Sequence, residues 1–322
     1  MTMLDIIIVN WNTGKLLRDC LESILITNRQ GFGISRVVVV DNASSDGSAE
    51  GLEELDLPLV VVHNTDNRGF ATACNQGALG SKADYLLFLN PDTQLFSNSL
   101  SEPLLFMEQP ENSHIGICGL KLTDEVGNPT TSCARFPTLT IFFGRITGLS
   151  RLFPNFFPEH LMSSQELFHS LEVDQIIGAF FLVRRSVYEG IEGFDERFFM
   201  YFEEVDFSLR AKRKGYLSYY LSHVSAYHKG NGSTGQIKPS RLFYSLKSRI
   251  QYGFKHYSYW ESIILVLISI IFEPVTRILL SIKRFSLADF KETMIGYGKL
   301  LSYLIRGGLI ENIRQKQSIR KN

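Results

Sequence analysis

A carboxylate stands directly after one of the most apolar segments of the chain. Residues 85–89 read YLLFL, and Asn90, Pro91 and Asp92 follow at once. Ligands of open α/β sheets bind at the carboxyl ends of the strands, and a carboxylate there can hold Mg²⁺ or Mn²⁺. One carboxylate is enough when a substrate diphosphate supplies further oxygens. Because Asn, Pro and Asp are also common turn residues, a plain turn is the alternative.

Three acids within four residues form a second candidate site. Glu203, Glu204 and Asp206 stand in a segment rich in phenylalanine and tyrosine. The aromatic neighbours are Phe198, Phe199, Tyr201, Phe202 and Phe207. An apolar environment raises the pKa of a carboxyl group toward values that suit a general base. The alternative is an acidic first turn of a helix, which the helix dipole favours.

A histidine late in the chain is the third candidate. His228 follows a possible strand and precedes Gly230, Gly232 and Gly235. A single histidine is more often structural than a ligand. The glycine-rich sequence after it favours a loop that closes on a ligand, so both interpretations stand.

Polar residues also follow a valine-rich strand at 36–41. Asp41 and Asn42 end this strand, and a serine-rich loop with Asp46 and Ser48 comes next. A carboxylate at a strand end can accept hydrogen bonds from a nucleobase N–H or a ribose hydroxyl. The alternative is a helix start capped by Asp46 or Ser48, and both can hold at once.

A glycine-containing loop precedes the next expected helix. It reads Asn67-Arg68-Gly69, with Asn75 further along the same helix. Helix N-termini bind anions through their free N–H groups and their dipole. The loop is neither a G-x-G-x-x-G nor a G-x-x-x-x-G-K-[ST] motif, which disfavours a dehydrogenase or a kinase.

These residues need a scaffold, and the first half of the chain predicts one. Short β-branched runs alternate with helical periodicity, which indicates a mainly parallel sheet with right-handed crossovers. The predicted strands cover 5–10, 36–41, 59–64, 85–90, 115–122 and the start of 175–188, and the predicted helices cover 14–28, 69–80 and the segment after Glu203. Residues 44–55 indicate a turn and a helix start, and residues 136–170 a loop or lid region with short helices.

The last 80 residues differ in charge and composition. From Arg241 to the end there are fourteen Lys and Arg against five Asp and Glu, a net of +9, which balances −9 in residues 1–240. The most apolar stretch, Ile263–Phe272, is about half the ~20 residues that a spanning helix needs. The flanking cations and aromatic residues are typical of an interfacial anchor, so association with a membrane surface is favoured over a buried helix pair and over spanning.

The cysteines and the N-terminus give no sign of secretion. Cys20, Cys74, Cys118 and Cys133 form no C-x-x-C pair and have apolar neighbours. Buried reduced thiols are therefore expected, which fits the cytosol. Residues 1–12 lack a basic n-region, and Asp5 interrupts the apolar run, so no secretory signal is predicted.

Seven motifs in fixed order resemble glycosyltransferase family 2, closest to its bacterial rhamnosyltransferase-like branch. They are DIIIVNWN, VVVDNASSDGS, NRGFAxAxNxG, FLNPD, GAFFLVRR, GFDERFFMYFEEVDFSLR and HKGxGS. The resemblance covers about residues 4–235. It implies an α/β GT-A fold, a Rossmann-like, mainly parallel sheet that binds nucleoside-diphospho-sugars. It also implies a catalytic domain at 1–240 and a helical, membrane-associating extension at 241–322.

The resemblance also implies residue roles. Asp92, with His228, would bind Mn²⁺ or Mg²⁺, and Glu204 would be the catalytic base, with Glu203 and Asp206 beside it. The donor-binding residues would be Asn10, Asp41, Asn42, Asn67, Gly69, Asn75 and Asn90, and Arg210 would hold the acceptor region or structure beside it. The sequence departs from the family pattern twice. Asn90 replaces the first Asp of D-x-D, and Glu204 replaces an Asp, which makes its assignment over Glu203 less secure.

The expected function is an inverting, metal-dependent glycosyl transfer in bacterial cell-surface polysaccharide synthesis. The donor would be a nucleoside-diphosphate sugar, with dTDP-rhamnose ahead of a uridine-linked sugar. The acceptor would be a glycan, preferably lipid-linked, at the inner face of the cytoplasmic membrane, and no nucleic acid is expected as a partner. The alternatives are a non-catalytic membrane-associated scaffold or sugar-nucleotide sensor, and a nucleotidyltransferase. The latter would need a second carboxylate cluster or a basic phosphate loop.

Overall fold

The computed structural model describes residues 1–230 and 238–319, and the described residues form two compact units. The first contains residues 1–136, 161–196 and 203–230, and the second contains residues 137–160, 197–202 and 238–319. Gly232 and Gly235, two of the glycines after His228, lie outside the described residues. The domain boundary predicted after residue 240 stays a prediction. By compactness, residues 137–160 and 197–202 group with the C-terminal helices.

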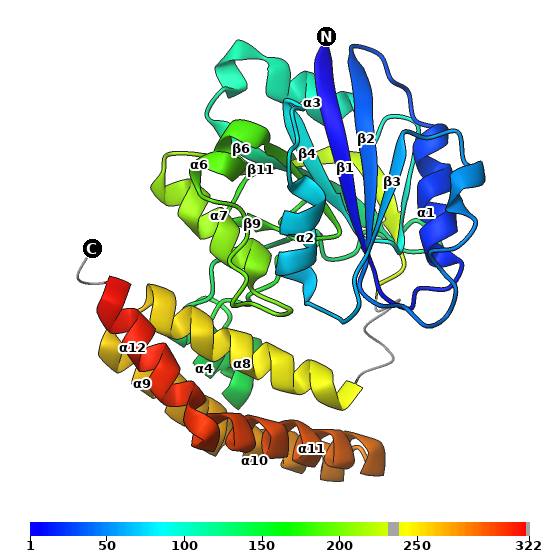
Figure 1. Ribbon diagram of the computed structural model, residues 1–322. Helices are drawn as coiled ribbons and strands as arrows, with labels where there is room; N and C mark the ends of the chain where they lie inside the picture. The colour runs from blue at the N-terminus through cyan, green and yellow to red at the C-terminus, as the bar shows by residue number, and fades with distance from the viewer. Residues whose placement is uncertain (231–237, 320–322) are drawn as a thin grey trace. The chain divides into compact units, whose positions relative to one another are not determined.

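Four parallel strands form the part of the sheet that the sequence predicted most directly (Figure 1). In spatial order they are β3 (Leu59–His63), β2 (Phe32–Asp41), β1 (Thr2–Asn10) and β4 (Tyr85–Leu89). The connecting helices are α1 (Leu16–Leu25) and α2 (Phe70–Ala78). Residues 44–55 hold only a 3₁₀ turn, η1 (Leu52–Glu54), because Gly47 and Gly51 adopt positive φ and interrupt the helix start.

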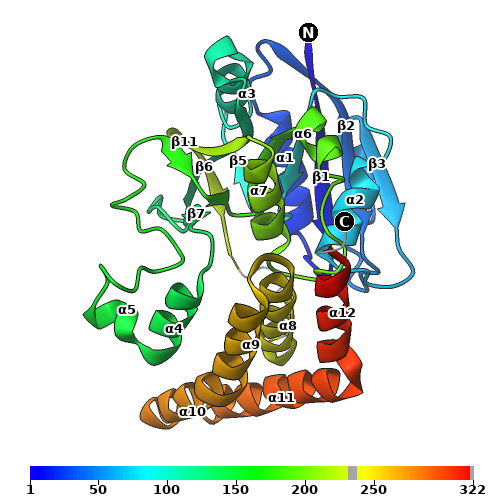
Figure 2. The ribbon, with the colours of Figure 1, turned by 90° about the vertical axis from the view of Figure 1, so that its left-hand side faces the viewer.

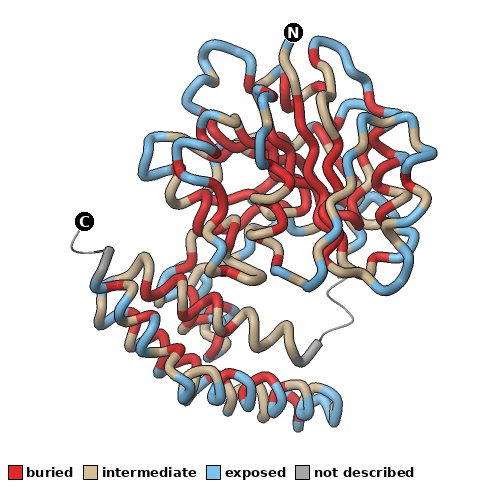
Figure 3. Tube along the Cα trace, in the orientation of Figure 1, coloured by how far each residue is buried: buried red, intermediate tan, exposed pale blue. Residues whose placement is uncertain are grey.

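Strands β1, β2 and β4 are buried on both faces, as continuous β-branched runs predict, whereas the edge strand β3 is only partly buried. Ile6 and Ile8 of β1 belong to one core cluster with Leu17 of α1, whereas Ile7 belongs to a second cluster with Ala71 of α2. Alternate residues of a strand point to opposite faces, so α1 and α2 cover opposite faces of the sheet. The sheet is accordingly the most deeply buried part of this unit (Figure 3).

Helix α2 lies unusually close to the sheet. A Cβ atom at Gly77 would be 2.4 Å from Cγ2 of Ile7 and 3.2 Å from Cγ2 of Val40. Only glycine therefore fits at this position, and its absence of a side chain sets the depth of α2 on the sheet. The loop before α2, residues 67–69, is thereby fixed at the carboxyl edge of the sheet.

The second half of the sheet is mixed. Beyond β4 the sheet continues, in spatial order, with β10 (Phe180–Arg184), β6 (Ile115–Thr123), β11 (Leu217–His228) and β5 (Thr93–Leu95). Strand β8 (Leu171–Val173) also pairs with β11, so the sheet has nine strands. A small sheet pairs β7 (Cys133–Ala134) with β9 (Gln175–Ile176). The helices of this half are α3 (Ser101–Glu108), α6 (Arg185–Gly190) and α7 (Glu203–Arg213), with a 3₁₀ turn η2 (Pro110–Asn112).

Strand directions decide which ends meet. β10 is antiparallel to both β4 and β6, and β11 is parallel to β6. β11 therefore runs in the same direction as β1, β2, β3 and β4. The carboxyl ends of all five strands lie at one edge of the sheet.

The second unit is helical. It contains α4 (Leu139–Thr147), α5 (Leu149–Leu152), α8 (Lys238–His256), α9 (Tyr259–Leu267), α10 (Glu273–Lys283), α11 (Leu287–Tyr303) and α12 (Leu309–Ile319), with π-helical turns at Ile268–Phe272 and Leu304–Gly308 (Figure 2). Leu246, Ile250 and Phe254 of α8 pack with Tyr297 and Leu300 of α11 in its core. The loop predicted at 136–170 does carry short helices, as expected.

One helical stretch among the described residues, Tyr259–Lys283, is long and apolar enough to cross a membrane by length and composition. Seven of its nine exposed large apolar residues recur every three or four positions and so form one stripe, and Phe272 and Leu280 are the other two. The seven are Trp260, Ile264, Leu267, Ile271, Val275, Leu279 and Ile282. Only 28% of its most apolar window is buried, which disfavours the alternative of a fully buried helix pair.

The four cysteines are free and buried, which confirms the prediction from their apolar neighbours. Burial raises the pKa of each thiol above its ordinary value. They are therefore protonated at neutral pH and are unsuited to nucleophilic or metal-binding roles.

Candidate active site

Polar side chains mark the carboxyl edge of the sheet. Asn10 ends β1, Asp41 ends β2, His63 ends β3 and His228 ends β11, and Asn90 follows β4. Parallel strands carry their carboxyl ends to the same edge, so residues separated by more than two hundred positions share one region. This is the region where α/β sheets bind ligands.

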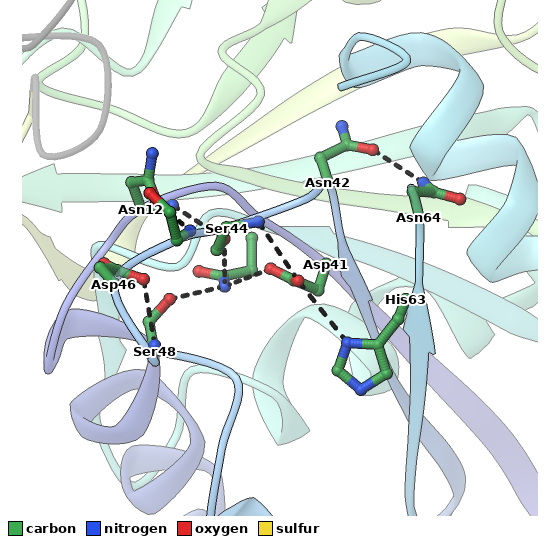
Figure 4. A network of polar contacts seen from close by, with 10 residues as sticks. Asn12, Asp41, Asn42, Ser44, Asp46, Ser48, His63 and Asn64 are labelled. Carbon is green, nitrogen blue, oxygen red and sulfur yellow. Dashed lines mark hydrogen bonds and ion pairs between the residues drawn. The ribbon is translucent and has the colours of Figure 1, made fainter. Parts of the chain in front are cut away.

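Asn10 and Asp41 form the centre of a polar network (Figure 4). Asn10 is fully buried, and its Nδ2 donates to Asp41 Oδ1 at 2.9 Å and to Ser48 Oγ at 2.8 Å. The backbone N–H of Ser44 donates to Asp41 Oδ2 at 3.3 Å, and His63 Nδ1 lies 3.6 Å from the same oxygen. The Asp41 carboxylate is thus held in a fixed orientation at the strand end.

The serine-rich loop after β2 is tied to the loop after β1. The backbone N–H of Asn12 donates to Ser44 Oγ at 2.9 Å, and Asn12 Oδ1 accepts from the N–H of Ser45 at 2.8 Å. Asp46 accepts from the N–H of Gly14 at 2.8 Å. Burial alone would raise the pKa of Asp46, but hydrogen bonds from Ser48 and Gly14 hold it below its ordinary value. The interpretation of Asp46 or Ser48 as a helix cap is wrong, because no α-helix begins here and both residues brace the loops instead.

Asn42 links the strand edge to the start of α2. Its Nδ2 donates to the carbonyl of Gly69 at 3.2 Å, and its Oδ1 accepts from Asn64 Nδ2 at 2.8 Å. Asn67 Oδ1 accepts from the N–H of Gly69 at 3.0 Å. Gly69 adopts a φ of 85°, a conformation that favours glycine. Asn42, Asn67 and Gly69 therefore lie together, and a donor contact from each stays a prediction.

The segment after β4 is a tight turn between two strands. The N–H of Thr93 donates to the carbonyl of Asn90 at 3.1 Å, and the chain continues at once as β5. Pro91 and Asp92 are the central residues of this turn. The plain-turn interpretation is therefore confirmed, and the functional interpretation stays a prediction that agrees with the position of Asp92 at the sheet edge.

Asp92 meets His228 across β5 and β11. The register pairs His228 with Thr93, and His228 Nε2 lies 3.3 Å from Asp92 Oδ1. The N–H of Lys229 donates to the main-chain oxygen of Asp92 at 3.1 Å, which holds the two segments together. Both side chains are largely buried. Two residues 136 positions apart in the chain are thus brought together as the motifs predicted.

This pair suits a divalent cation that shares its ligands with a substrate. A carboxylate oxygen and an imidazole nitrogen are a donor set that Mn²⁺ accepts, and Mg²⁺ accepts the carboxylate. Residues 1–230 and 238–319 contain no group of three or more His, Cys, Asp or Glu that could hold a metal by themselves. The remaining ligands would have to come from a diphosphate and water.

Glu203 and Glu204 are the first residues of α7, and backbone N–H groups of the helix start donate to their carboxyl groups. One oxygen of each, Oε2, is buried and has no hydrogen-bond partner among the described residues. Burial raises the pKa of both carboxyl groups, and the charge of Glu204 raises the pKa of Glu203 further. The charges of Glu203 and Glu204 also raise the pKa of the buried Cys74 thiol, so both carboxyl groups lie close to α2. Glu203 is buried, whereas Glu204 is only partly buried, so Glu204 is the more accessible member of the pair.

Asp206 has a different environment. It is fully buried, and its Oδ2 accepts from Arg210 Nε at 2.7 Å. The other nitrogens of Arg210 donate to the carbonyls of Ile191 at 2.5 Å and Gly193 at 2.7 Å. Asp206 and Arg210 therefore fix the segment before α7, and this geometry favours a structural role for Asp206 over the catalytic role predicted from sequence.

Asn75 is also committed to that segment. Its Oδ1 accepts from the Tyr188 hydroxyl at 2.6 Å and from the N–H of Phe194 at 3.0 Å. Its Nδ2 donates to the carbonyl of Phe194 and to Glu196 Oε1, each at 2.9 Å. A donor contact from Asn75 stays a prediction, which these four bonds disfavour. They instead connect α2 to the segment that leads to α7.

Sequence reasoning did not single out several residues of the network. Asn12 and Ser44 brace the loops, and Thr13 donates from Oγ1 to Asn10 Oδ1 at 2.5 Å. His63 could have been noticed, because it ends a strand as Asp41 does. The others carry no such signal, since serine, threonine and asparagine are common in any loop.

Comparison with known proteins supports a common family and fold. The family model described as Glycosyl transferase family 2 matches residues 5–191. An N-acetylglucosaminyl-diphospho-decaprenol L-rhamnosyltransferase of Mycobacterium tuberculosis is 26% identical over 81% of this chain and 87% of its own. Rhamnosyltransferase WbbL of Escherichia coli is 26% identical over 52% of this chain and 61% of its own.

A solved structure extends the similarity to the fold. The mannosyltransferase PcManGT of Pyrobaculum calidifontis, in complex with GDP-Man and Mn²⁺, has a TM-score of 0.53 and covers 98% of this chain and 86% of its own. At 14% sequence identity this likeness concerns the fold alone. The GT-A fold expected from the sequence motifs is thereby confirmed.

Proposed function

The chain belongs to glycosyl transferase family 2 and is a glycosyltransferase. From this premise we propose that transfer inverts the configuration at the anomeric carbon of the sugar. The donor is a nucleoside-diphosphate sugar, preferably dTDP-rhamnose, and the acceptor is a hydroxyl of a lipid-linked glycan. The observation that carries this proposal is the contact between Asp92 and His228 at the carboxyl edge of the sheet. The contact would give a diphosphate-bound cation a place at the same sheet edge as the proposed nucleoside-binding residues.

The nucleoside would bind at Asn10 and Asp41. The Asp41 carboxylate is buried and oriented by Asn10, so it can accept hydrogen bonds from a base or ribose without further ordering. The loop at 67–69 and the start of α2 would lie beside the same nucleotide. Asn90 would contribute from the turn that presents Asp92.

Asp92 and His228 would hold Mn²⁺ or Mg²⁺. When bound, such an ion supplies positive charge that stabilises the diphosphate as it leaves. The chain's own part is to hold the carboxylate and the imidazole 3.3 Å apart on two paired strands.

Glu204 would act as the general base. The acceptor oxygen forms a bond to the anomeric carbon, the bond from that carbon to the diphosphate oxygen breaks, and the hydroxyl proton passes to Glu204. A single displacement from the opposite face inverts the anomeric configuration. Glu204 fits the role better than Glu203, because its side chain is less deeply buried and an acceptor hydroxyl can reach it more readily.

The names of the relatives support the choice of substrates. Both named relatives are rhamnosyltransferases, and one acts on an N-acetylglucosaminyl-diphospho-decaprenol. A rhamnose donor and a polyprenyl-diphosphate-linked sugar are therefore the first substrates to test. A uridine-linked sugar donor is the second choice.

The test is a screen of the full chain against nucleoside-diphosphate sugars, with Mn²⁺, with Mg²⁺ and with EDTA. Each donor is offered with a polyprenyl-diphosphate-linked N-acetylglucosamine. We expect one donor to bind only with the metal and to yield a product of inverted configuration by NMR. Transfer that is equally fast in EDTA would contradict metal dependence, and a product of retained configuration would contradict the single displacement.

We also propose that residues 241–322 attach the enzyme to the inner face of the cytoplasmic membrane. The apolar stripe on Tyr259–Lys283 occupies one side of the helix, whereas Ser262, Ser269 and Glu273 on another side are buried within the unit. A one-sided helix suits the membrane surface better than the bilayer interior.

Replacing Ile271 and Leu279 by aspartate should release the protein from the membrane. Both side chains are more than half exposed, so the fold of the unit should persist. The measurement is flotation with vesicles that contain anionic lipid. The buried side of the helix, which includes Ser262, is left unchanged in the variant. If the variant floats as the parent does, the stripe is not the attachment surface.

A further inference from the structure

The helical unit contains a cavity of about 520 Å³ between α8, α10 and α11. Figure 2 shows these helices, and α11 contacts both of the others. Three arginines line the cavity, together with serine and threonine hydroxyls. They are Arg241, Arg277, Arg284, Ser245, Ser281 and Thr293. None of these residues belongs to the nucleotide region or to the acidic pair of α7.

The charges around the cavity are not balanced. Arg277 donates to Glu273 Oε1 at 2.7 and 2.9 Å, while Arg249 donates to Glu273 Oε2 at 2.5 Å, so two guanidinium groups share one carboxylate. Although burial raises the pKa of Glu273, the two arginines hold it below its ordinary value, so Glu273 is ionised. This triad carries one net positive charge.

The lining and the triad together carry one net positive charge, because Arg277 belongs to both sets. Arg284 Nη1 lies 3.8 Å from Asp289 Oδ2, too far for a hydrogen bond, and Glu292 is the second acid of the lining. In the lining alone, three guanidinium groups against two carboxylates leave one positive charge. Guanidinium groups and hydroxyls are the donors that bind phosphate oxygens in proteins. The cavity is therefore complementary to a phosphate or a diphosphate.

An apolar surface adjoins this cationic cavity. Leu280 lines the cavity and is 47% exposed. Phe285 and Leu287, at the turn between α10 and α11, are 95% and 76% exposed. A phosphate on a long apolar chain would place its head in the cavity and its chain along these side chains. An inorganic anion would use the arginines alone and leave the apolar surface uncovered.

The cavity also touches the segment that precedes the proposed base. Tyr201 lines it, and the Tyr201 hydroxyl accepts from Arg241 Nε at 3.2 Å. Tyr201 and Phe202 have φ values of 69° and 71°, in the left-handed region that bulky residues rarely adopt. The next residue in the chain is Glu203. A ligand in the cavity would thus contact the strained segment that leads to α7.

We propose that this cavity binds the diphosphate of a polyprenyl-linked acceptor, with the prenyl chain along Leu280, Phe285 and Leu287. The inference rests on the proposed function, because it assigns a site to the acceptor of that reaction. It makes the helical unit a recognition element for the acceptor's diphosphate as well as an attachment to the membrane.

The experiment measures binding of farnesyl diphosphate to the full chain in a zwitterionic detergent, with farnesol and inorganic pyrophosphate as comparison ligands. The variants are R241Q/R284Q and R284Q alone, whose side chain is 65% exposed and outside the core. The matched control is R306Q, an exposed arginine of the same unit that does not line the cavity. Binding of the nucleotide-sugar donor to the parent protein is measured in parallel.

We expect farnesyl diphosphate to bind more tightly than either comparison ligand. R241Q/R284Q should weaken it about tenfold or more, since each charge-assisted hydrogen bond contributes that order, and R284Q alone by less. R306Q should bind as the parent does. The inference would be overturned if R306Q weakened binding as much as R241Q/R284Q, or if R241Q/R284Q did not weaken it. It would also be overturned if pyrophosphate or farnesol bound as tightly as farnesyl diphosphate. A parent protein that binds the donor but not farnesyl diphosphate overturns this inference alone, whereas failure to bind any donor overturns the proposed function.

Discussion

D92A should lose metal-dependent donor binding. Asp92 supplies the one carboxylate beside His228 Nε2, and within the described residues no third acidic or sulfur ligand joins them. Loss of a direct ligand from so small a set should weaken donor binding in Mn²⁺ by at least about 100-fold, because loss of even an outer-shell partner of a metal ligand typically costs about 10- to 100-fold. The measurement is calorimetric titration of the donor with Mn²⁺ and with EDTA.

The matched control is D56A, which removes an exposed aspartate from the loop before β3. It should bind the donor as the parent does. H228A should lose metal-dependent binding as well, and D92A/H228A should be little weaker than either single variant because both act on one ion. Metal-dependent binding that survives in D92A, or additive losses in the double variant, would show that the two residues do not share a cation.

E204Q should stop turnover while the donor still binds. Gln keeps the size of the side chain but cannot accept the acceptor proton. General-base catalysis contributes about 10²- to 10⁴-fold, so the turnover number should fall by that order. E203Q is the matched control, because it makes the same change at the neighbouring residue, whose side chain is more deeply buried than that of Glu204. If E203Q is the inactive variant and E204Q the active one, the base is Glu203.

The pH dependence follows from the same carboxyl groups. Burial raises the pKa of Glu204 above that of a free glutamate, and the base works only when ionised. Turnover should therefore rise with pH through an apparent pKa above the ordinary range of glutamate. In E203Q the other buried carboxyl group is gone, so only Glu204 should titrate there. A rate profile that is flat from pH 5 to pH 8 would contradict the role of a buried base.

Stability should change with pH in the opposite sense. The folded state binds protons at Glu203 and Glu204 more tightly than the unfolded state does, because burial raises both pKa values. Below the ordinary pKa of glutamate both states are protonated, and these two groups do not alter stability. Above it the free energy of unfolding falls until the folded groups ionise as well. E203Q removes one such group, so its stability relative to the parent should grow as the pH rises.

The fold of the first unit could be read from the sequence where the pattern was strong. β1, β2, β3 and β4 were predicted because buried parallel strands are continuous β-branched or apolar runs. The helix start at residues 44–55 was wrong, since Gly47 and Gly51 take positive φ and the side chains there bind neighbouring loops instead. The antiparallel pairing of β10 with β4 and β6 was not predicted, because periodicity gives no partner and no direction.

The site residues divide in the same way. The motifs selected Asp92, His228, Glu203 and Glu204, and the structure places each in surroundings that suit its proposed role. They could not separate Asp206 from its two neighbours. That difference arises from Arg210, one turn later on α7, which occupies the Asp206 carboxylate. Asn75 likewise matches a motif but is bonded on both its oxygen and its nitrogen to the segment at 188–196.

The sequence alone determined the family, the parallel strands and the residue types that the chemistry needs, because these depend on local order and on motifs. Tertiary structure alone decided that Asp92 and His228 stand 3.3 Å apart, since only the pairing of β5 with β11 joins positions so distant in the chain. It also decided that burial raises the pKa of both Glu203 and Glu204. Desolvation and the distance between charges set a pKa, and neither quantity is written in the order of the residues.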